Sequence, residues 1–189
     1  MGRWEISKSF DFCYGHRVHT QVLDTELSCN AKCKCRHQHG HQGLLTVYLP
    51  DDELNEQGMV LDFVNLNFVK KFIDDVVDHK MILDMEDPSL KVLYPVLSKI
   101  DTYNAERIDE YLEYHTDGKY FSIWKDLYAD EPSFQKEIYE GLVFVPFIPT
   151  SENLSKWFYD VISDKLKGIA RVSHIEFYET PKSKSVYYG

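Results

Sequence analysis

Two segments with helical periodicity, 62–79 and 149–168, constrain the fold of this 189-residue chain more than any other feature. In both, apolar residues recur every three or four positions, which is typical of a helix that buries one face. Asp62 is placed to cap the first helix, and Thr150 or Ser151 to cap the second. Each helix therefore needs an apolar surface to cover.

Segments of alternating polarity supply that surface on both sides of the helices. The predicted strands are 4–12, 41–50, 169–180 and 185–189. The order strand, strand, helix, long middle section, helix, strand, strand predicts an α+β fold with two helices on one face of a four-stranded antiparallel sheet. The middle section, 84–146, is acidic and aromatic. We predict that it is a mostly helical insertion within one domain spanning 1–189.

Composition narrows the class of protein. The formal net charge of −10 argues against a nucleic-acid-binding surface, which needs a basic face. The chain has no apolar run long enough to span a membrane, and its first residues lack the apolar core of a secretory signal. We therefore expect a cytoplasmic protein that binds neither nucleic acid nor membranes.

The segment CKCRHQHGHQG, residues 33–43, concentrates cysteine and histidine. His39 and His41 flank Gly40, and in a strand residues two apart point to the same face. His16, at the end of the first predicted strand, would lie close if the first two strands pair. Three histidines with an open fourth position are typical of a catalytic zinc site.

Cys35 lies four residues before His39, in the loop that leads to this strand. A thiol beside a zinc ion and a basic residue has a lowered pKa and can act as a base. Two other interpretations stay open: a closed structural zinc site formed by Cys29, Cys33, Cys35 and one histidine, or histidines that are only polar strand residues. His37 shares the parity of His39 and is a rival ligand.

Three further residues gain meaning only in combination with that segment. Asp78 and His79 follow the first helix; by themselves they suit a solvated helix end. Beside a cysteine base, however, a histidine held by an aspartate is how a proton relay is oriented. Glu179, late in a predicted strand, would alone be read as an exposed carboxylate.

Taken as a set, these residues resemble the 6-pyruvoyl-tetrahydropterin synthase / 6-carboxy-tetrahydropterin synthase family. The matching pieces occur in the order FDFCYGHR, CRHQHGH, GMVLDF, DHKMIL, PTSEN and YET. They cover both ends of the chain, 1–83 and 147–189. Any one of them is weakly specific, whereas six in order with sensible gaps are strongly specific.

The resemblance implies a tunnelling fold, or T-fold, that assembles as a homohexamer (a dimer of trimers) with sites between subunits. By position, it implies that His16, His39 and His41 bind Zn²⁺ and that Cys35 is the catalytic base. Asp78 and His79 would be its relay or the acid. Glu179 would accept hydrogen bonds from the guanidine-like edge of a pterin, and Thr150, Ser151 and Glu152 would also contact the pterin.

The implied substrate is 7,8-dihydroneopterin triphosphate. One branch of the family forms 6-carboxy-5,6,7,8-tetrahydropterin with release of acetaldehyde and triphosphate, in queuosine and 7-deazapurine biosynthesis. The other forms 6-pyruvoyl-tetrahydropterin by triphosphate elimination. A cysteine four residues before the first histidine of the HxH pair, as Cys35 is, is similar to the carboxy branch. Cys33 satisfies the gap of six of the pyruvoyl branch.

The motifs MVLDF and PTSEN are more similar to the carboxy branch, so we favour that activity. Two departures from the family pattern are Tyr14 and Gly15, where small residues are usual, and the insertion of about sixty residues. Two hypotheses from other classes stay open: a non-catalytic relative that binds pterin or zinc, and a structural zinc module used for protein interaction.

Overall fold

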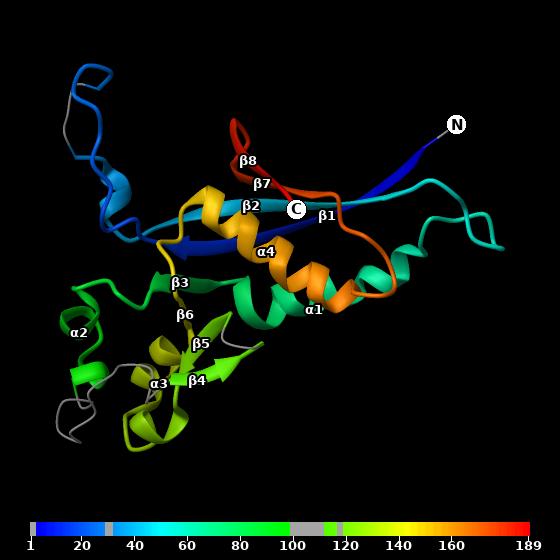
Figure 1. Cartoon of the computed structure of the whole chain (residues 1–189). Coiled ribbons are helices and arrows are strands. Elements are labelled where there is room, and N and C mark those ends of the chain that lie inside the picture. Colours follow the sequence, from blue (N-terminus) through cyan, green and yellow to red (C-terminus); the bar gives the residue numbers. More distant parts are fainter. Residues whose placement is uncertain (1–2, 29–31, 99–111, 117–118) are drawn as a thin grey trace. The chain divides into compact units, whose positions relative to one another are not determined.

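The computed structural model describes residues 3–28, 32–98, 112–116 and 119–189 (Figure 1). The chain divides into two compact units. The first comprises 1–14, 40–78 and 150–189, and the second comprises 15–39 and 79–149.

The first unit contains the strands that both ends of the sequence predict. These are β1 (Trp4–His16), β2 (His39–Asp51), β7 (His174–Thr180) and β8 (Ser183–Tyr188). They are neighbours in the order β1-β2-β7-β8. The β2–β7 and β7–β8 pairs are antiparallel, with Leu45 opposite Phe177 and His174 opposite Tyr188. The last two residues of β1 and the first of β2 belong to the second unit.

The first predicted helix is a continuous helical stretch of three geometries. A 3₁₀ turn (Phe63–Leu66) leads into α1 (Asn67–Phe72), and a π-helical turn (Ile73–Val77) follows. The Asp62 carboxylate accepts a hydrogen bond from the backbone N–H of Val64 at 2.9 Å, as expected of a cap. The stretch ends at Val77, so both predicted ends are confirmed to within two residues.

The second predicted helix is α4 (Ser151–Leu166), which packs on β7 and β8 (Figure 1). The Thr150 hydroxyl accepts from the backbone N–H of Asn153 at 3.3 Å and caps it. Gly168, with a φ of 79°, follows the last turn. None of the described helices is long and apolar enough to cross a membrane. The predicted buried stripe is confirmed at Leu154, Trp157, Phe158, Val161, Ile162 and Leu166.

Phe158 is the centre of the core of this unit. Its ring is fully buried and lies 5.8 Å from the ring of Phe12 on β1 and 5.5 Å from that of Phe177 on β7. Phe72 of α1 meets the same ring edge-on at 6.5 Å. Both helices and two of the strands therefore share one aromatic cluster, which fixes them to each other.

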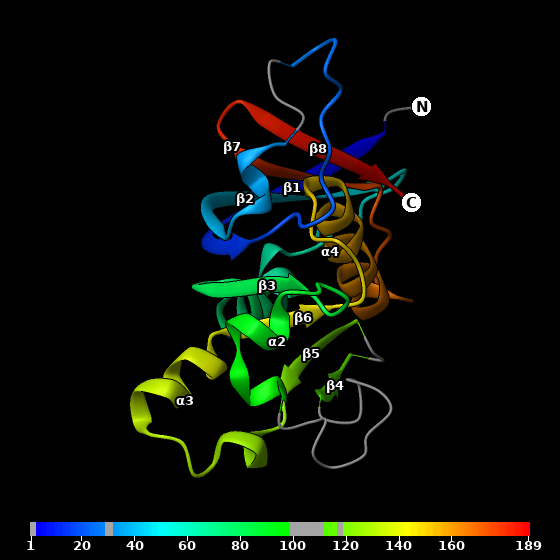
Figure 2. The same ribbon diagram turned by 90° about the vertical axis from the view of Figure 1, so that its left-hand side faces the viewer.

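The second unit has its own core and strands (Figure 2). The strands are β3 (Lys80–Asp84), β4 (Leu112–His115), β5 (Tyr120–Ile123) and β6 (Leu142–Val145). β3 and β6 are parallel, whereas β4–β5 and β5–β6 are antiparallel. The helices are α2 (Leu90–Leu93) and α3 (Ser133–Glu140), and a 3₁₀ turn spans Lys125–Tyr128.

The predicted α+β class is confirmed, but the predicted four-stranded antiparallel sheet is wrong. The described part of the insertion contains the strands β4, β5 and β6 besides its helices. The strand order is β1-β2-β7-β8 in the first unit and β4-β5-β6-β3 in the second, where β3 and β6 are parallel, so there are more than four strands and the pairing is mixed. Runs such as LVFV at 142–145 are apolar and short, and short apolar runs do not distinguish a buried strand from a buried helix. Residues 99–111 and 117–118 of the insertion lie outside the described residues, and its place within a single domain stays a prediction.

Replacing Phe158 by alanine tests the aromatic cluster. Because the ring is fully buried among three others, we expect the free energy of unfolding to fall by about 3–5 kcal/mol, measured by chemical denaturation. Phe134→Ala removes a ring that is 63% exposed, and it should change the free energy of unfolding by less than about 0.5 kcal/mol. Equal losses in the two variants would contradict the assigned core.

Candidate metal and pterin site

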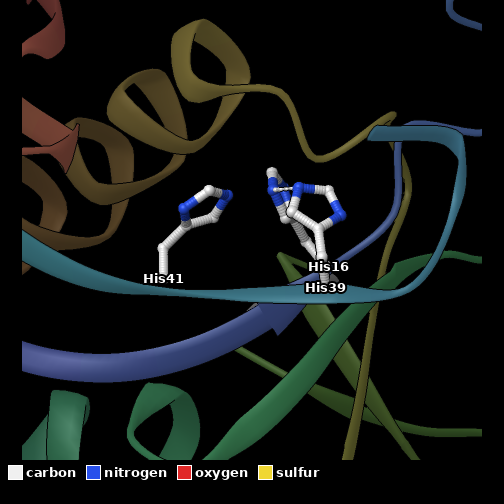
Figure 3. A group of neighbouring side chains, drawn as sticks. All are labelled: His16, His39 and His41. Atoms are coloured by element: carbon white, nitrogen blue, oxygen red, sulfur yellow. Dashed lines mark hydrogen bonds between the residues drawn. The ribbon is translucent and has the colours of Figure 1, made fainter. Parts of the chain in front are cut away.

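Three histidines come together where β1 ends and β2 begins (Figure 3). His16 is the last residue of β1, and His39 and His41 are the first and third residues of the neighbouring strand β2. One ring nitrogen from each lies within 4.8 Å of the others. His16 is buried, with an exposed fraction of 1%. The predicted pairing of the first two strands is therefore what gathers the three imidazoles.

Backbone carbonyls orient two of these rings. Nδ1 of His16 lies 2.6 Å from the carbonyl oxygen of Pro149, and Nδ1 of His39 lies 2.8 Å from that of His37. A carbonyl only accepts, so each Nδ1 carries the hydrogen and each neutral ring has its lone pair on Nε2. This is the tautomer in which a metal-bound histidine donates its other N–H to an outer acceptor.

The two Nε2 atoms then face each other at 3.0 Å. Two lone pairs at this distance repel unless a proton or a cation lies between them. A tetrahedral zinc with Zn–N bonds of about 2.0–2.1 Å holds its nitrogens roughly 3.3 Å apart. The donor set and its spacing thus fit a divalent metal ion, and His16, His39 and His41 can form a metal site.

Glycines allow the strands that carry the histidines to approach closely. A Cβ on Gly15 would lie 3.3 Å from the carbonyl oxygen of His39, and one on Gly40 would lie 3.2 Å from the carbonyl oxygen of Tyr14. Contacts this short force a shift of the neighbouring atoms. Gly40 therefore keeps the face opposite His39 and His41 clear.

Glu179 and Tyr14 lie beside His41 in the first unit. The Glu179 carboxylate is 3.7 Å from Nε2 of His41, and the Tyr14 ring centroid is 5.8 Å from that of His41. Burial, and secondly the Glu179 charge, raise the pKa of the Tyr14 hydroxyl far above its ordinary value. Tyr14 therefore stays protonated at any working pH, next to the predicted pterin anchor.

The two described cysteines of the loop form a close pair. Residues Lys34–Arg36 make a 3₁₀ turn, and the Sγ atoms of Cys33 and Cys35 lie 3.2 Å apart. The backbone N–H of Cys35, and secondly its thiol, hold the pKa of Cys33 below its ordinary value by hydrogen bonding to the thiolate. Cys29, the other member of the alternative structural zinc site, lies outside the described residues.

Asp78 and His79 form the connection between the π-helical turn and β3. The Asp78 carboxylate accepts a hydrogen bond from the backbone N–H of Cys13 at 2.8 Å. His79 has a positive φ of 59° and an exposed side chain. Non-glycine residues with a positive φ are uncommon, and backbone strain of this kind clusters at functional sites. The predicted relay therefore sits at a specialised turn, and its role stays a prediction.

The start of α4 presents the predicted pterin-contact residues. The Thr150 hydroxyl accepts a hydrogen bond from the backbone N–H of Asn153. The Ser151 hydroxyl lies 2.9 Å from that of Ser185, and Glu152 is exposed. Pro149, whose carbonyl orients His16, immediately precedes them. The hydrogen bond between His16 and Pro149 thus links a predicted metal ligand to the first residue of the PTSEN segment.

Comparison with known proteins identifies the family. The family model described as 6-pyruvoyl tetrahydropterin synthase matches residues 5–189. This chain belongs to that family. A 6-carboxy-5,6,7,8-tetrahydropterin synthase of Aquifex aeolicus is 31% identical over 98% of both chains. A protein of the same description from Rickettsia typhi is 29% identical over 55% of this chain and 64% of its own length.

Solved structures agree with the fold. The structure of an uncharacterised protein from Wolinella succinogenes has a TM-score of 0.90 and 37% identity, and covers 100% of this chain and 99% of its own. The 6-pyruvoyl tetrahydropterin synthase of Caenorhabditis elegans has a TM-score of 0.56 and 19% identity, over 100% and 97% of the two chains. The second likeness shows the fold alone.

The orienting groups of the site were missed by the sequence reasoning. Two of them are backbone carbonyls, of Pro149 and His37, and a carbonyl leaves no signature in the side-chain pattern. His37, a rival ligand in the sequence, lies outside the group that can hold a metal among the described residues. Tyr14 was noted only as a departure from the family pattern, although its bulk where small residues are usual was the available signal.

Bound metal tests the histidine site. We expect the purified protein to hold a divalent ion, and His16→Ala, His39→Ala and His41→Ala each to lower metal content at least about tenfold, because one of three protein ligands is lost. Elemental analysis after dialysis measures this. His174→Ala, whose ring bonds to the Ser173 hydroxyl, is the control. Unchanged metal in the His16 variant would refute the site.

Proposed function

We propose that this chain is a zinc-dependent 6-carboxy-5,6,7,8-tetrahydropterin synthase. It would convert 7,8-dihydroneopterin triphosphate to 6-carboxy-tetrahydropterin with release of acetaldehyde and triphosphate, in queuosine or 7-deazapurine biosynthesis. The observation that carries the proposal is the pair of carbonyl-oriented imidazoles whose Nε2 atoms converge at 3.0 Å beside a third histidine. The relative from Aquifex aeolicus, matched over 98% of both chains, supports the carboxy branch.

In this proposal His16, His39 and His41 hold the zinc ion. When bound, zinc supplies Lewis acidity toward oxygen atoms of a substrate. Nδ1–H of His16 and Nδ1–H of His39 donate to their carbonyls, which keeps both rings in the ligating tautomer. Glu179 accepts hydrogen bonds from the guanidine-like edge of the pterin, and Thr150, Ser151 and Glu152 line the ring.

In this proposal a residue of the cysteine turn carries out the proton transfer. Sγ of Cys35 removes the hydrogen bound to carbon on the substrate side chain, and Asp78 and His79 relay a proton or act as the acid. The thiol of Cys33 lies 3.2 Å from Sγ of Cys35 and is hydrogen-bonded to it. We further propose a cytoplasmic homohexamer, a dimer of trimers with sites between subunits.

One observation favours the second candidate, a 6-pyruvoyl-tetrahydropterin synthase. The thiol whose pKa is lowered is that of Cys33, which has the six-residue gap of the pyruvoyl branch. If Cys33 were the base, elimination of triphosphate without loss of acetaldehyde would be the expected reaction. The two candidates therefore differ both in the reactive thiol and in the product.

Product analysis decides between the candidates. We expect the zinc-loaded protein with 7,8-dihydroneopterin triphosphate to release acetaldehyde and form 6-carboxy-tetrahydropterin, identified by mass spectrometry. Cys35→Ala should lower the rate at least about 100-fold, because the base is lost, while Cys33→Ala retains most of it. A pyruvoyl product with the reverse order of the two variants would establish the second candidate. Bound pterin without turnover would indicate a non-catalytic relative.

Glu179→Gln tests the pterin anchor. A hydrogen bond to a charged acceptor contributes about 1.5–3 kcal/mol to the free energy of binding, so we expect KM for the substrate to rise roughly 10- to 100-fold. Steady-state kinetics measures this. Glu176→Gln is the matched control on the same strand, since its carboxylate already bonds to Tyr48 and Lys184. An unchanged KM in the Glu179 variant would remove this residue from the site.

A further inference from the structure

Arg17, the residue after His16, is largely buried and its guanidinium joins three groups. Its Nε donates to the carbonyl oxygen of Arg36 at 2.7 Å. Its Nη1 lies 3.2 Å from a carboxylate oxygen of Asp87 and donates to the Ser89 hydroxyl. The Arg17 side chain is 19% exposed and that of Asp87 is 2% exposed. This is an enclosed ion pair, not a solvated surface contact.

These contacts bear on the cysteine turn. The backbone N–H of Val18 donates to the carbonyl of Cys35 at 2.9 Å, while Arg17 holds the carbonyl of Arg36, the next residue. Inside the turn, the N–H of Arg36 donates to the carbonyl of Cys33 at 3.3 Å. Two successive carbonyls are therefore fixed by residues that directly follow a predicted metal ligand. The guanidinium fork suits this task because it donates in several fixed directions at once.

Asp87, the carboxylate that holds Arg17, lies near the start of the insertion. The Asp87 carboxylate also accepts from the backbone N–H of Ser89 at 2.9 Å and from its hydroxyl at 2.7 Å. A second contact joins the same two segments, because Nε2 of His19 lies 3.0 Å from a carboxylate oxygen of Asp84. The end of β3 and the turn after it therefore present two acidic groups, Asp84 and Asp87, to the segment that follows β1, and their charge-assisted bonds are the strong kind.

We propose that Arg17 is a positioning residue that holds the Cys33–Cys35 turn for proton transfer, with Asp87 as its anchor. The inference rests on the proposed function, since it assigns the turn a reacting thiol. A misplacement of the base by about 1 Å costs on the order of 100-fold in rate. Loss of the Arg17 contacts thus acts on the chemical step rather than on substrate binding.

Four variants and a matched control test the proposal. Arg17→Met and Asp87→Asn each remove one end of the pair, and the double variant removes both without leaving one buried charge unpartnered. Arg17→Lys keeps the charge but not the fork. Arg3→Met is the control, because Arg3 pairs with Asp52 at 3.1 Å where the two side chains are 69% and 77% exposed.

Two readouts separate positioning from a merely structural role. We expect kcat to fall about 10- to 100-fold in the Arg17→Met, Arg17→Lys and Asp87→Asn variants, with KM and bound metal changed less than about threefold. The double variant should be no worse than Arg17→Met. The iodoacetamide alkylation rate of Cys33 and Cys35, resolved by peptide mass and referred to exposed Cys13, should shift at least about threefold. Arg3→Met should match the unaltered protein.

The result that overturns the proposal is an unchanged alkylation ratio, or a fall in kcat that only follows loss of folded protein or of metal. If Arg17→Met does not fold, Asp87→Asn and the double variant decide by the same readouts. If the unaltered protein does not turn over the pterin triphosphate, the proposed function fails. The alkylation ratio still tests whether Arg17 positions the turn, so the two failures are distinguishable.

Discussion

The arrangement of His16 and His39 depends on what lies between two Nε2 atoms that face each other at 3.0 Å. Each ring gives its Nδ1 hydrogen to a backbone carbonyl, so two lone pairs meet at 3.0 Å. The ends of β1 and β2, brought close by Gly15 and Gly40, hold this geometry. A bound cation would replace the repulsion between these lone pairs with two bonds and would couple metal binding to the local stability of the strand ends.

The groups proposed for the reaction lie on two kinds of scaffold. The metal ligands are on strands, whose backbone is fixed by neighbouring strands, and this suits a site that needs precise geometry. The thiols lie on a short 3₁₀ turn, which fixes little by itself, so its place depends on hydrogen bonds from Arg17 and Val18. The insertion supplies Asp87 to that network, so an acidic segment takes part in holding the cysteine turn.

Local patterns predicted the site better than they predicted the fold around it. The spacing of His39 and His41 and the parity of a strand were enough to place two imidazoles on one face, and the pairing of the first two strands brought His16 to them. The same kind of reasoning missed β4, β5 and β6, where short runs formed strands. β6 is fixed by its parallel pairing with the distant strand β3, and β4 and β5 by pairing with each other across a turn; the period within a single run does not encode such pairing.

The sequence by itself determined the two amphipathic helices with their caps, the strands at both ends and the histidine and cysteine types of the site, because these depend on periods and residue chemistry. Only the tertiary structure decided the tautomers of His16 and His39, the parallel pairing of β3 with β6 and the enclosure of Arg17 with Asp87. All but the His39 tautomer are contacts between segments far apart in the chain, and both tautomers are set by backbone carbonyls, which every residue carries alike.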